Sequence, residues 1–162
     1  MAGASAVGAA AAVLFLAPQP DRTARAQTAM TVIAAPASTP SSSHAIAKSA
    51  DGHYWAEAQV DGAPVRFLVD TGATAVALTP ADAQRLGIAV DALPYVQQVV
   101  TAGGQARAAS VRLKSVTVAG VAISDVDALV IETGLDASLL GMSYLGRLTS
   151  FQATREALFL QP

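Results

Sequence analysis

The chain has 162 residues, of which 52% are hydrophobic, 14% are charged and none is cysteine. The lack of cysteine excludes a disulfide framework, a thiolate zinc site and a cysteine nucleophile, and two histidines are too few for a multi-histidine metal site. The formal net charge of −2 gives no sign of the basic surface expected of a nucleic-acid binder. From these observations together we expect no metal, no cofactor and no nucleic-acid partner.

The N-terminal segment Ala2–Ala17 contains only small or apolar residues and no charge. It is shorter than the roughly 20 apolar residues that span a bilayer and suits the apolar region of a secretory signal. Ala24-Arg25-Ala26 supplies an A-x-A cleavage pattern, although no basic residue precedes the apolar run. We interpret residues 1–26 as a signal peptide or an N-terminal membrane anchor, with a disordered Ala-rich tail as a third reading. The protein would then be exported (periplasmic or secreted) or held at a membrane through residues 2–17.

Residues 27–50 are rich in Pro, Ser and Ala, and they show no hydrophobic period. Such a segment buries too little apolar area to offset the entropy lost on ordering. We therefore predict a disordered tether, in which His44 is exposed and has no role.

The folded domain is predicted to occupy residues 51–162. Residues 54–60 alternate with a period of two, Asp61-Gly62 favours a hairpin turn, and residues 65–69 form an apolar strand. After a short strand at 76–78, Thr79 is a good N-cap and Pro80 suits the first position of a helix that ends at Leu86.

The remaining segments are short and separated by turns, which is typical of a β-barrel. The sequence predicts strands at 95–100, 106–118, 121–123, 126–131, 139–141, 151–153 and 157–160, a flexible tip at 102–105 and a short helix at 142–148. The predicted fold class is all-β, a small closed or partly closed barrel with one or two short helices.

One cluster offers catalytic chemistry. Asp70 follows a buried strand, so its carboxylate is expected at the floor of a cleft. Gly72 allows a sharp turn and a close approach of the backbone to substrate or water, and the Thr71 hydroxyl can lock the loop. An isolated Asp-Thr-Gly is more often an ordinary turn, so its context decides.

That context resembles the active-site sequence of aspartic peptidases of the retropepsin type over Phe67–Thr74. Ala102-Gly103-Gly104 lies where such proteins place the tip of a flap, and Leu139-Leu140-Gly141 with the following helix looks like their late hydrophobic-hydrophobic-glycine turn. The resemblance covers roughly residues 52–161 and is closest to bacterial retropepsin-like proteins with an N-terminal apolar segment. It implies the acid-protease barrel fold.

The resemblance also implies roles for individual residues. Asp70, Thr71 and Gly72 would be the catalytic loop, with Asp70 as the catalytic carboxylate and Thr71 bracing the loops of two chains. The substrate-binding residues would be Ala73, Thr74, Ala102, Gly103 and Gly104. Because the chemistry needs two carboxyls that share one proton and the chain has one Asp-Thr-Gly, the resemblance implies a homodimer.

Other acidic and aromatic residues receive simpler interpretations. Glu132-Thr133-Gly134 imitates the catalytic sequence but comes too late to begin a second lobe, so we predict a loop between strands. Asp125, Asp127 and Asp136 are expected to face solvent, and Trp55 is expected to pack on the barrel.

Two hypotheses follow. The first is an aspartic endopeptidase that hydrolyses peptide bonds of a peptide or protein substrate, with water activated by an Asp70 pair across a homodimer. The second is a non-catalytic module on the same barrel that binds an extended peptide by strand addition.

Overall fold

The computed structural model describes residues 44–162. The predicted signal or anchor at 1–26 and the part of the predicted tether at 27–43 lie outside the described residues. Within residues 44–162, every helix is too short or too polar to cross a membrane.

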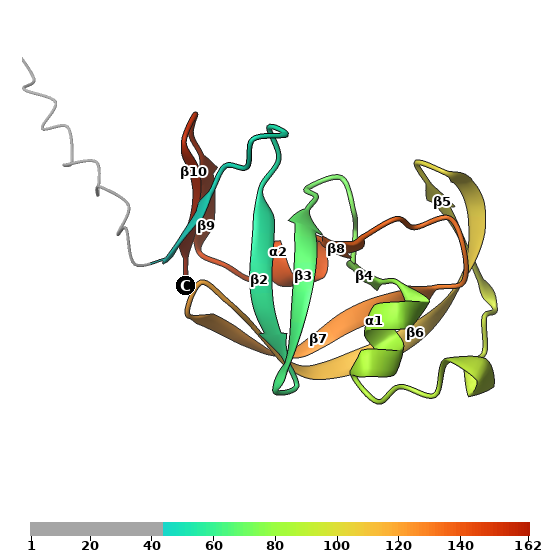
Figure 1. Cartoon of the computed structure of the whole chain (residues 1–162). Helices are drawn as coiled ribbons and strands as arrows, with labels where there is room; N and C mark the ends of the chain where they lie inside the picture. Colours follow the sequence, from blue (N-terminus) through green and yellow to red (C-terminus); the bar gives the residue numbers. More distant parts are fainter. Residues whose placement is uncertain (1–43) are drawn as a thin grey trace, which may run out of the picture. The chain divides into compact units, whose positions relative to one another are not determined.

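The described part of the chain consists mainly of β-strands (Figure 1). The strands are β1 (Ala45–Ala47), β2 (Trp55–Val60), β3 (Ala63–Val69), β4 (Val76–Leu78), β5 (Gln97–Thr101), β6 (Gly104–Val118), β7 (Val121–Ile131), β8 (Ser138–Leu140), β9 (Ser150–Ala153) and β10 (Ala157–Gln161). The helical elements are α1 (Pro80–Arg85), the 3₁₀ turn η2 (Val90–Ala92) and α2 (Met142–Leu145).

Six strands close into a barrel in the order β2-β3-β8-β4-β7-β6, and β2 pairs again with β6. The 15-residue β6 makes closure possible, because its C-terminal end pairs with β2 while its N-terminal end extends beyond the barrel and pairs with β5. Two parallel pairings, β3 with β8 and β4 with β7, bring the middle of the chain against its later part. The predicted all-β barrel with two short helices is confirmed.

The predicted β2–β3 hairpin is confirmed. Asp61 and Gly62 have φ of 50° and 88°, the positive values that a tight hairpin turn needs at both positions. Ala56, Ala58 and Val60 point into the core, with at most 2% of their surface exposed. The alternation that predicted the strand is therefore the alternation between the barrel interior and its surface.

The predicted helix at 80–86 is also confirmed by its cap. The Thr79 hydroxyl accepts a hydrogen bond from the Asp82 N–H at 3.1 Å, Pro80 occupies the first turn, and Gly87 follows with φ of 79°. Apolar side chains from strands and helices fill the barrel, and the largest that are fully buried include Phe67, Leu78, Leu113, Leu140, Tyr144 and Leu145.

The prediction of a disordered tether reaching residue 50 is wrong at its C-terminal end. Residues 45–47 form β1, which pairs with β10 through Ala45 and Phe159, and Ile46 is only 7% exposed. His44 is half-buried rather than idle, because its Nδ1 lies 2.7 Å from the carbonyl oxygen of Ala119. The pairing partner lies more than 100 residues away, so local composition gave no sign of this strand.

Two element boundaries also differ from the prediction. The expected strands at 121–123 and 126–131 are one strand, β7, with a distortion at Asp125, where φ is 51° and the register with β6 continues on both sides. The expected helix at 142–148 is the shorter α2, because Gly146 ends it after one turn.

Candidate active site

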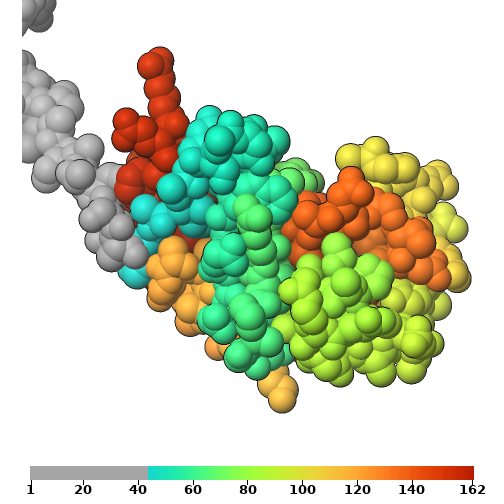
Figure 2. Space-filling model, in the orientation of Figure 1, coloured from blue at the N-terminus to red at the C-terminus, as the bar shows by residue number. Residues whose placement is uncertain are grey.

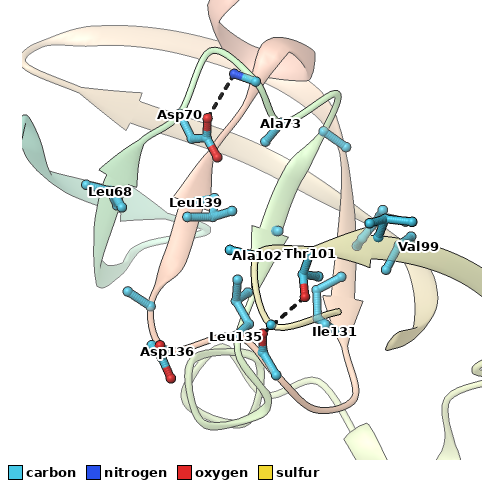
Figure 3. A pocket seen from close by; sticks show the side chains of 18 of the residues that line it. Leu68, Asp70, Ala73, Val99, Thr101, Ala102, Ile131, Leu135, Asp136 and Leu139 are labelled. Carbon is cyan, nitrogen blue, oxygen red and sulfur yellow. Dashed lines mark hydrogen bonds between the residues drawn. The ribbon is translucent and has the colours of Figure 1, made fainter. Parts of the chain in front are cut away.

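The Asp70 loop begins where β3 leaves the barrel. Asp70 is half-buried, and its Oδ1 accepts a hydrogen bond from the Gly72 N–H at 2.8 Å. The Ala73 N–H donates to the Asp70 carbonyl oxygen at 3.2 Å and closes a tight turn. The turn fixes one carboxylate oxygen against the backbone, and the side chain faces the cleft (Figure 3).

The segment that follows β8 holds this loop from beneath. The Asp70 N–H donates to the Leu140 carbonyl at 3.2 Å, and the Met142 N–H donates to the Ala73 carbonyl at 2.8 Å. A Cβ on Gly141 would lie 2.2 Å from the Ala75 carbonyl oxygen. Gly141 is therefore required by close packing of two backbones, and the prediction that this turn packs beneath the active loop is confirmed.

Ser143 ties the end of the loop to the barrel. Its Oγ accepts a hydrogen bond from the Val76 N–H at 2.8 Å and donates to the Asp127 carbonyl at 2.7 Å. The hydroxyl thus joins α2, β4 and β7 at one point. Both ends of the Asp70 loop are anchored by groups from distant parts of the chain.

A cleft of about 900 Å³ opens beside Asp70. Its walls come from β2, β3, β4, β7, β8 and the β5–β6 hairpin, and most of them are apolar. The apolar lining residues include Trp55, Leu68, Ala75, Ala77, Val99, Val100, Leu129, Ile131, Leu135, Ala137 and Leu139.

The structure gathers most of the predicted site residues in this cleft. Those that line it are Asp70, Gly72, Ala73, Thr74, Ala102 and Gly103. Thr71 is exposed and is not among the residues that line the cleft. Gly104 does not line the cleft; its φ of 108° and its pairing with Thr101 place it in the hairpin turn.

The β5–β6 hairpin, which we call the flap, closes one side of the cleft. Thr101 Oγ1 lies 3.0 Å from the Gly104 carbonyl oxygen and 3.3 Å from that of Gly134, with the hydroxyl as donor. A Cβ on Gly103 would lie 3.0 Å from the Gly134 carbonyl. In the space-filling view the yellow flap lies against the orange segment before β8 (Figure 2).

That segment includes Glu132-Thr133-Gly134, which lies between β7 and β8 as predicted. Glu132 Oε2 accepts a hydrogen bond from Arg107 Nε at 2.7 Å, so the side chain is part of an ion pair with β6. The sequence did not reveal that the Gly134 carbonyl accepts a hydrogen bond from Thr101 of the flap. The contact depends on a pairing between segments 33 residues apart.

Trp55 differs from its prediction as a packing residue. It is half-buried and lines the cleft, and its Nε1 donates to Asp51 Oδ2 at 2.8 Å. The Arg66 guanidinium lies 4.5 Å from the centroid of the Trp55 ring. Hydrogen bonds from the His53 N–H and the Trp55 indole lower the pKa of Asp51. Because Ala56 faces the core, the strand alternation could have placed Trp55 outside it.

Asp136 is exposed, as predicted, but it also lines the cleft. It lies at the opposite end from Asp70, with Leu139 between them (Figure 3). Its place two residues before β8 could not be read as part of the cleft until the parallel β3–β8 pairing was known.

Comparison with known proteins agrees with this geometry. The family model described as gag-polyprotein putative aspartyl protease matches residues 56–147, more than half of the chain. The chain belongs to the retropepsin-like aspartic peptidase family. A crystal structure of a retropepsin-like aspartic protease from Rickettsia conorii is 40% identical, with a TM-score of 0.66, over 72% of this chain and 96% of that one.

More distant and longer relatives extend the comparison. The EIAV protease in complex with the inhibitor HBY-793 shares the fold with this retropepsin-like chain, at 20% identity and a TM-score of 0.50 over 65% of this chain and 96% of that one. Two curated proteins described as uncharacterized, from Rickettsia prowazekii (strain Madrid E) and a Sinorhizobium species, are 41% and 39% identical over 115 residues, which is 71% and 70% of this chain. The chain spans 49% of the length of each of these curated relatives.

Proposed function

We propose that this retropepsin-like chain is an aspartic endopeptidase that acts as a homodimer. The observation that carries the proposal is the Asp70 loop, which holds the half-buried Asp70 at the wall of a mostly apolar cleft of about 900 Å³. An apolar cleft of this kind suits an extended peptide, which has backbone groups for hydrogen bonding and side chains for pockets on both sides.

The chemistry requires a second carboxyl group. One ionised carboxylate takes a proton from water while the water oxygen attacks the peptide carbonyl, and a protonated carboxyl donates its hydrogen to the carbonyl oxygen. As the tetrahedral intermediate collapses, the C–N bond breaks and the leaving nitrogen receives a proton. Two carboxyls close together share one proton, because like charges at that distance do not both ionise.

The chain supplies one Asp-Thr-Gly, so the second carboxyl would be Asp70 of a partner copy. The exposed side of the loop, which carries Thr71 and Gly72, is the surface available for that contact. We propose that the two loops meet on a two-fold axis there, with each Thr71 bracing the opposite loop. The cleft would then continue from one copy into the other.

The flap would have to leave Gly134 for a peptide to enter and would close over the bound chain. Gly103 and Gly104 favour such movement, since neither carries a side chain and Gly104 already has a positive φ. Ala73 and Thr74 at the cleft edge would contact the backbone of the peptide. Closure excludes water other than the attacking molecule.

The test is cleavage of a peptide library from acid to neutral pH, with pepstatin as inhibitor and Asp70→Asn as the inactive variant. We expect Asp70→Asn to lower kcat/KM by about 10³-fold or more, as for removal of a general acid–base group, with circular dichroism unchanged. The matched control is Asp127→Asn, an exposed aspartate that pairs with Arg112 and does not line the cleft. Equal cleavage by Asp70→Asn would overturn the proposal, and a strict monomer in sedimentation at high concentration would favour the non-catalytic binding module.

A further inference from the structure

The charged side chains that line the cleft are all acidic. Asp70 and Asp136 are the charged side chains among the residues that line it, and no lysine or arginine is among them. The rest of the lining is apolar, small or neutral. A substrate that enters this cleft therefore meets negative charge at two separate places.

Asp136 has no internal partner within residues 44–162. Neither an ion pair nor a hydrogen bond to its carboxylate occurs in that part of the chain, whereas Glu57, Asp82, Asp127 and Glu132 each pair with an arginine. Two arginines that contact residues in or next to the cleft lining already have partners, since Arg66 pairs with Glu57 and stacks on Trp55, and Arg107 pairs with Glu132. The charge of Asp136 is thus left for a group from outside the chain.

The position of Asp136 sets where that group would lie. Leu140 pairs with Val69, the residue before Asp70, and Asp136 lies in a bend two residues before β8 begins at Ser138. The three-residue β8 therefore separates the two aspartates, and Asp136 lies at the end of the cleft away from Asp70 (Figure 3). A substrate side chain that reaches Asp136 therefore belongs to a residue at some distance from the bond that would be cut beside Asp70.

The neighbours of Asp136 leave room for a long side chain. Leu135 and Ala137 flank it, and Leu139 lies between it and Asp70 (Figure 3). A lysine or arginine can lay its methylene stem along such apolar surface while its charged end reaches a carboxylate. A glutamate at the same place would meet a like charge, which is unfavourable.

We propose that Asp136 is a specificity-determining residue that selects a basic side chain, lysine or arginine, on the substrate at a position away from the scissile bond. The inference rests on the proposed function for the identity of the substrate as a peptide. It goes beyond that function because it assigns a charge preference to one wall of the cleft.

The test uses eight-residue peptides of alternating Ala and Leu, with Lys, Leu or Glu placed in turn at each position. Binding is measured on the full chain carrying Asp70→Asn, through fluorescence of Trp55, the only tryptophan and a residue of the cleft. We expect Lys to bind about fivefold more tightly than Leu, the scale of an exposed ion pair, at one position on each side of the scissile bond, because the proposed homodimer has two copies of Asp136. This ratio should fall as salt rises.

Three further substitutions in this Asp70→Asn chain test the role of Asp136. Adding Asp136→Asn is expected to reduce the Lys-to-Leu ratio to about one, adding Asp136→Lys is expected to transfer the preference to Glu, and adding Asp127→Asn is expected to leave the ratio at about fivefold. A merely structural role of Asp136 would not invert the preference. The inference is overturned if no position prefers Lys, whether because peptides bind without a charge preference or do not bind, or if the ratio survives in Asp136→Asn.

The same peptides separate this inference from the proposed function. If the unmodified chain cleaves none of them but the Lys preference depends on Asp136, the proposed activity fails and the charge preference stands. If cleavage occurs with no dependence on Asp136, the activity stands and the charge preference fails. If Asp136 instead pairs with a lysine or arginine of a second copy of the chain, cleavage likewise does not depend on Asp136, and the charge preference fails.

Discussion

The Asp70 loop and the flap face each other across the cleft but are held in opposite ways. The loop is bound at both ends by backbone and hydroxyl groups from β8, α2 and β7. The flap is an outer hairpin whose Val100 is 83% exposed, and its tip meets the opposite wall at Gly134 through the Thr101 hydroxyl and the close approach of Gly103. The difference separates two requirements, because a reacting group must be held in place while an entrance must open.

The largest expected effect comes from Gly141→Ala, which disturbs the support of the Asp70 loop. A Cβ would lie 2.2 Å from the Ala75 carbonyl oxygen and 2.8 Å from that of Ala73, so the backbones must move apart. We expect a loss of about 3 kcal/mol in the free energy of unfolding, at the upper end for overpacking, measured by urea denaturation. Gly62→Asn is the control, because nothing lies near its Cβ position and asparagine tolerates positive φ; an equal, small effect of both variants would contradict the account.

A second variant tests the same support through α2. Tyr144 is fully buried and its hydroxyl donates to the Val121 carbonyl at 2.8 Å, so Tyr144→Phe should cost about 1 kcal/mol at neutral pH. Burial raises the pKa of Tyr144 to about 12, whereas an unfolded tyrosine ionises near about 10.

The sign of the pH effect follows from these two values. The contribution of the neutral phenol is fully present below about pH 10 and is lost as the pH rises toward 12, because the unfolded chain ionises first. Tyr144→Phe lacks this group, so its stability should fall less steeply over that range in denaturation series. An unchanged slope would show that Tyr144 does not carry the alkaline effect.

On the flap side, Thr101→Val removes the hydroxyl that reaches Gly134 while keeping a similar shape. We expect amide hydrogen exchange in β5 to accelerate about threefold, consistent with the loss of a weak, exposed hydrogen bond. The free energy of unfolding should stay within about 0.5 kcal/mol of the parent. If exchange in β5 does not change, the hydroxyl does not hold the flap.

The smallest expected effect concerns the part of the cleft wall that contains Trp55. Hydrogen bonds from the His53 N–H and Trp55 Nε1 lower the pKa of Asp51 from 3.8, so their stabilising effect is present above that value and is lost as the pH falls below it. Trp55 fluorescence should therefore show a small transition at strongly acid pH. Asp51→Ala should remove the transition, and its persistence would assign the signal to another group.

Local signals were sufficient for the parts of the fold that local chemistry determines. Asp61-Gly62 marked the hairpin, and Thr79 with Pro80 marked the start of α1. The Asp70 loop was placed at the end of a buried strand for the same reason. In each case the residues that make the prediction also make the contacts.

The remaining features depend on partners that are distant in sequence. β1 was missed because Ile46 becomes buried only when β10 pairs beside it. The positions of Trp55 and Asp136 in the cleft lining were missed because the cleft walls are defined by the closure of the barrel and by the parallel β3–β8 pairing. Composition and periodicity give the faces of a strand, but they do not give its neighbours.

In the proposed mechanism, a single Asp70 becomes catalytically competent only beside the Asp70 of a second copy. The most direct measurement is specific peptidase activity of the full chain as a function of its concentration, with the dimer fraction followed by sedimentation in the same buffer. We expect activity per chain to rise in proportion to the dimer fraction, and we expect added Asp70→Asn chain to suppress it by forming mixed dimers. Constant activity per chain under conditions where the protein is monomeric would contradict this mechanism.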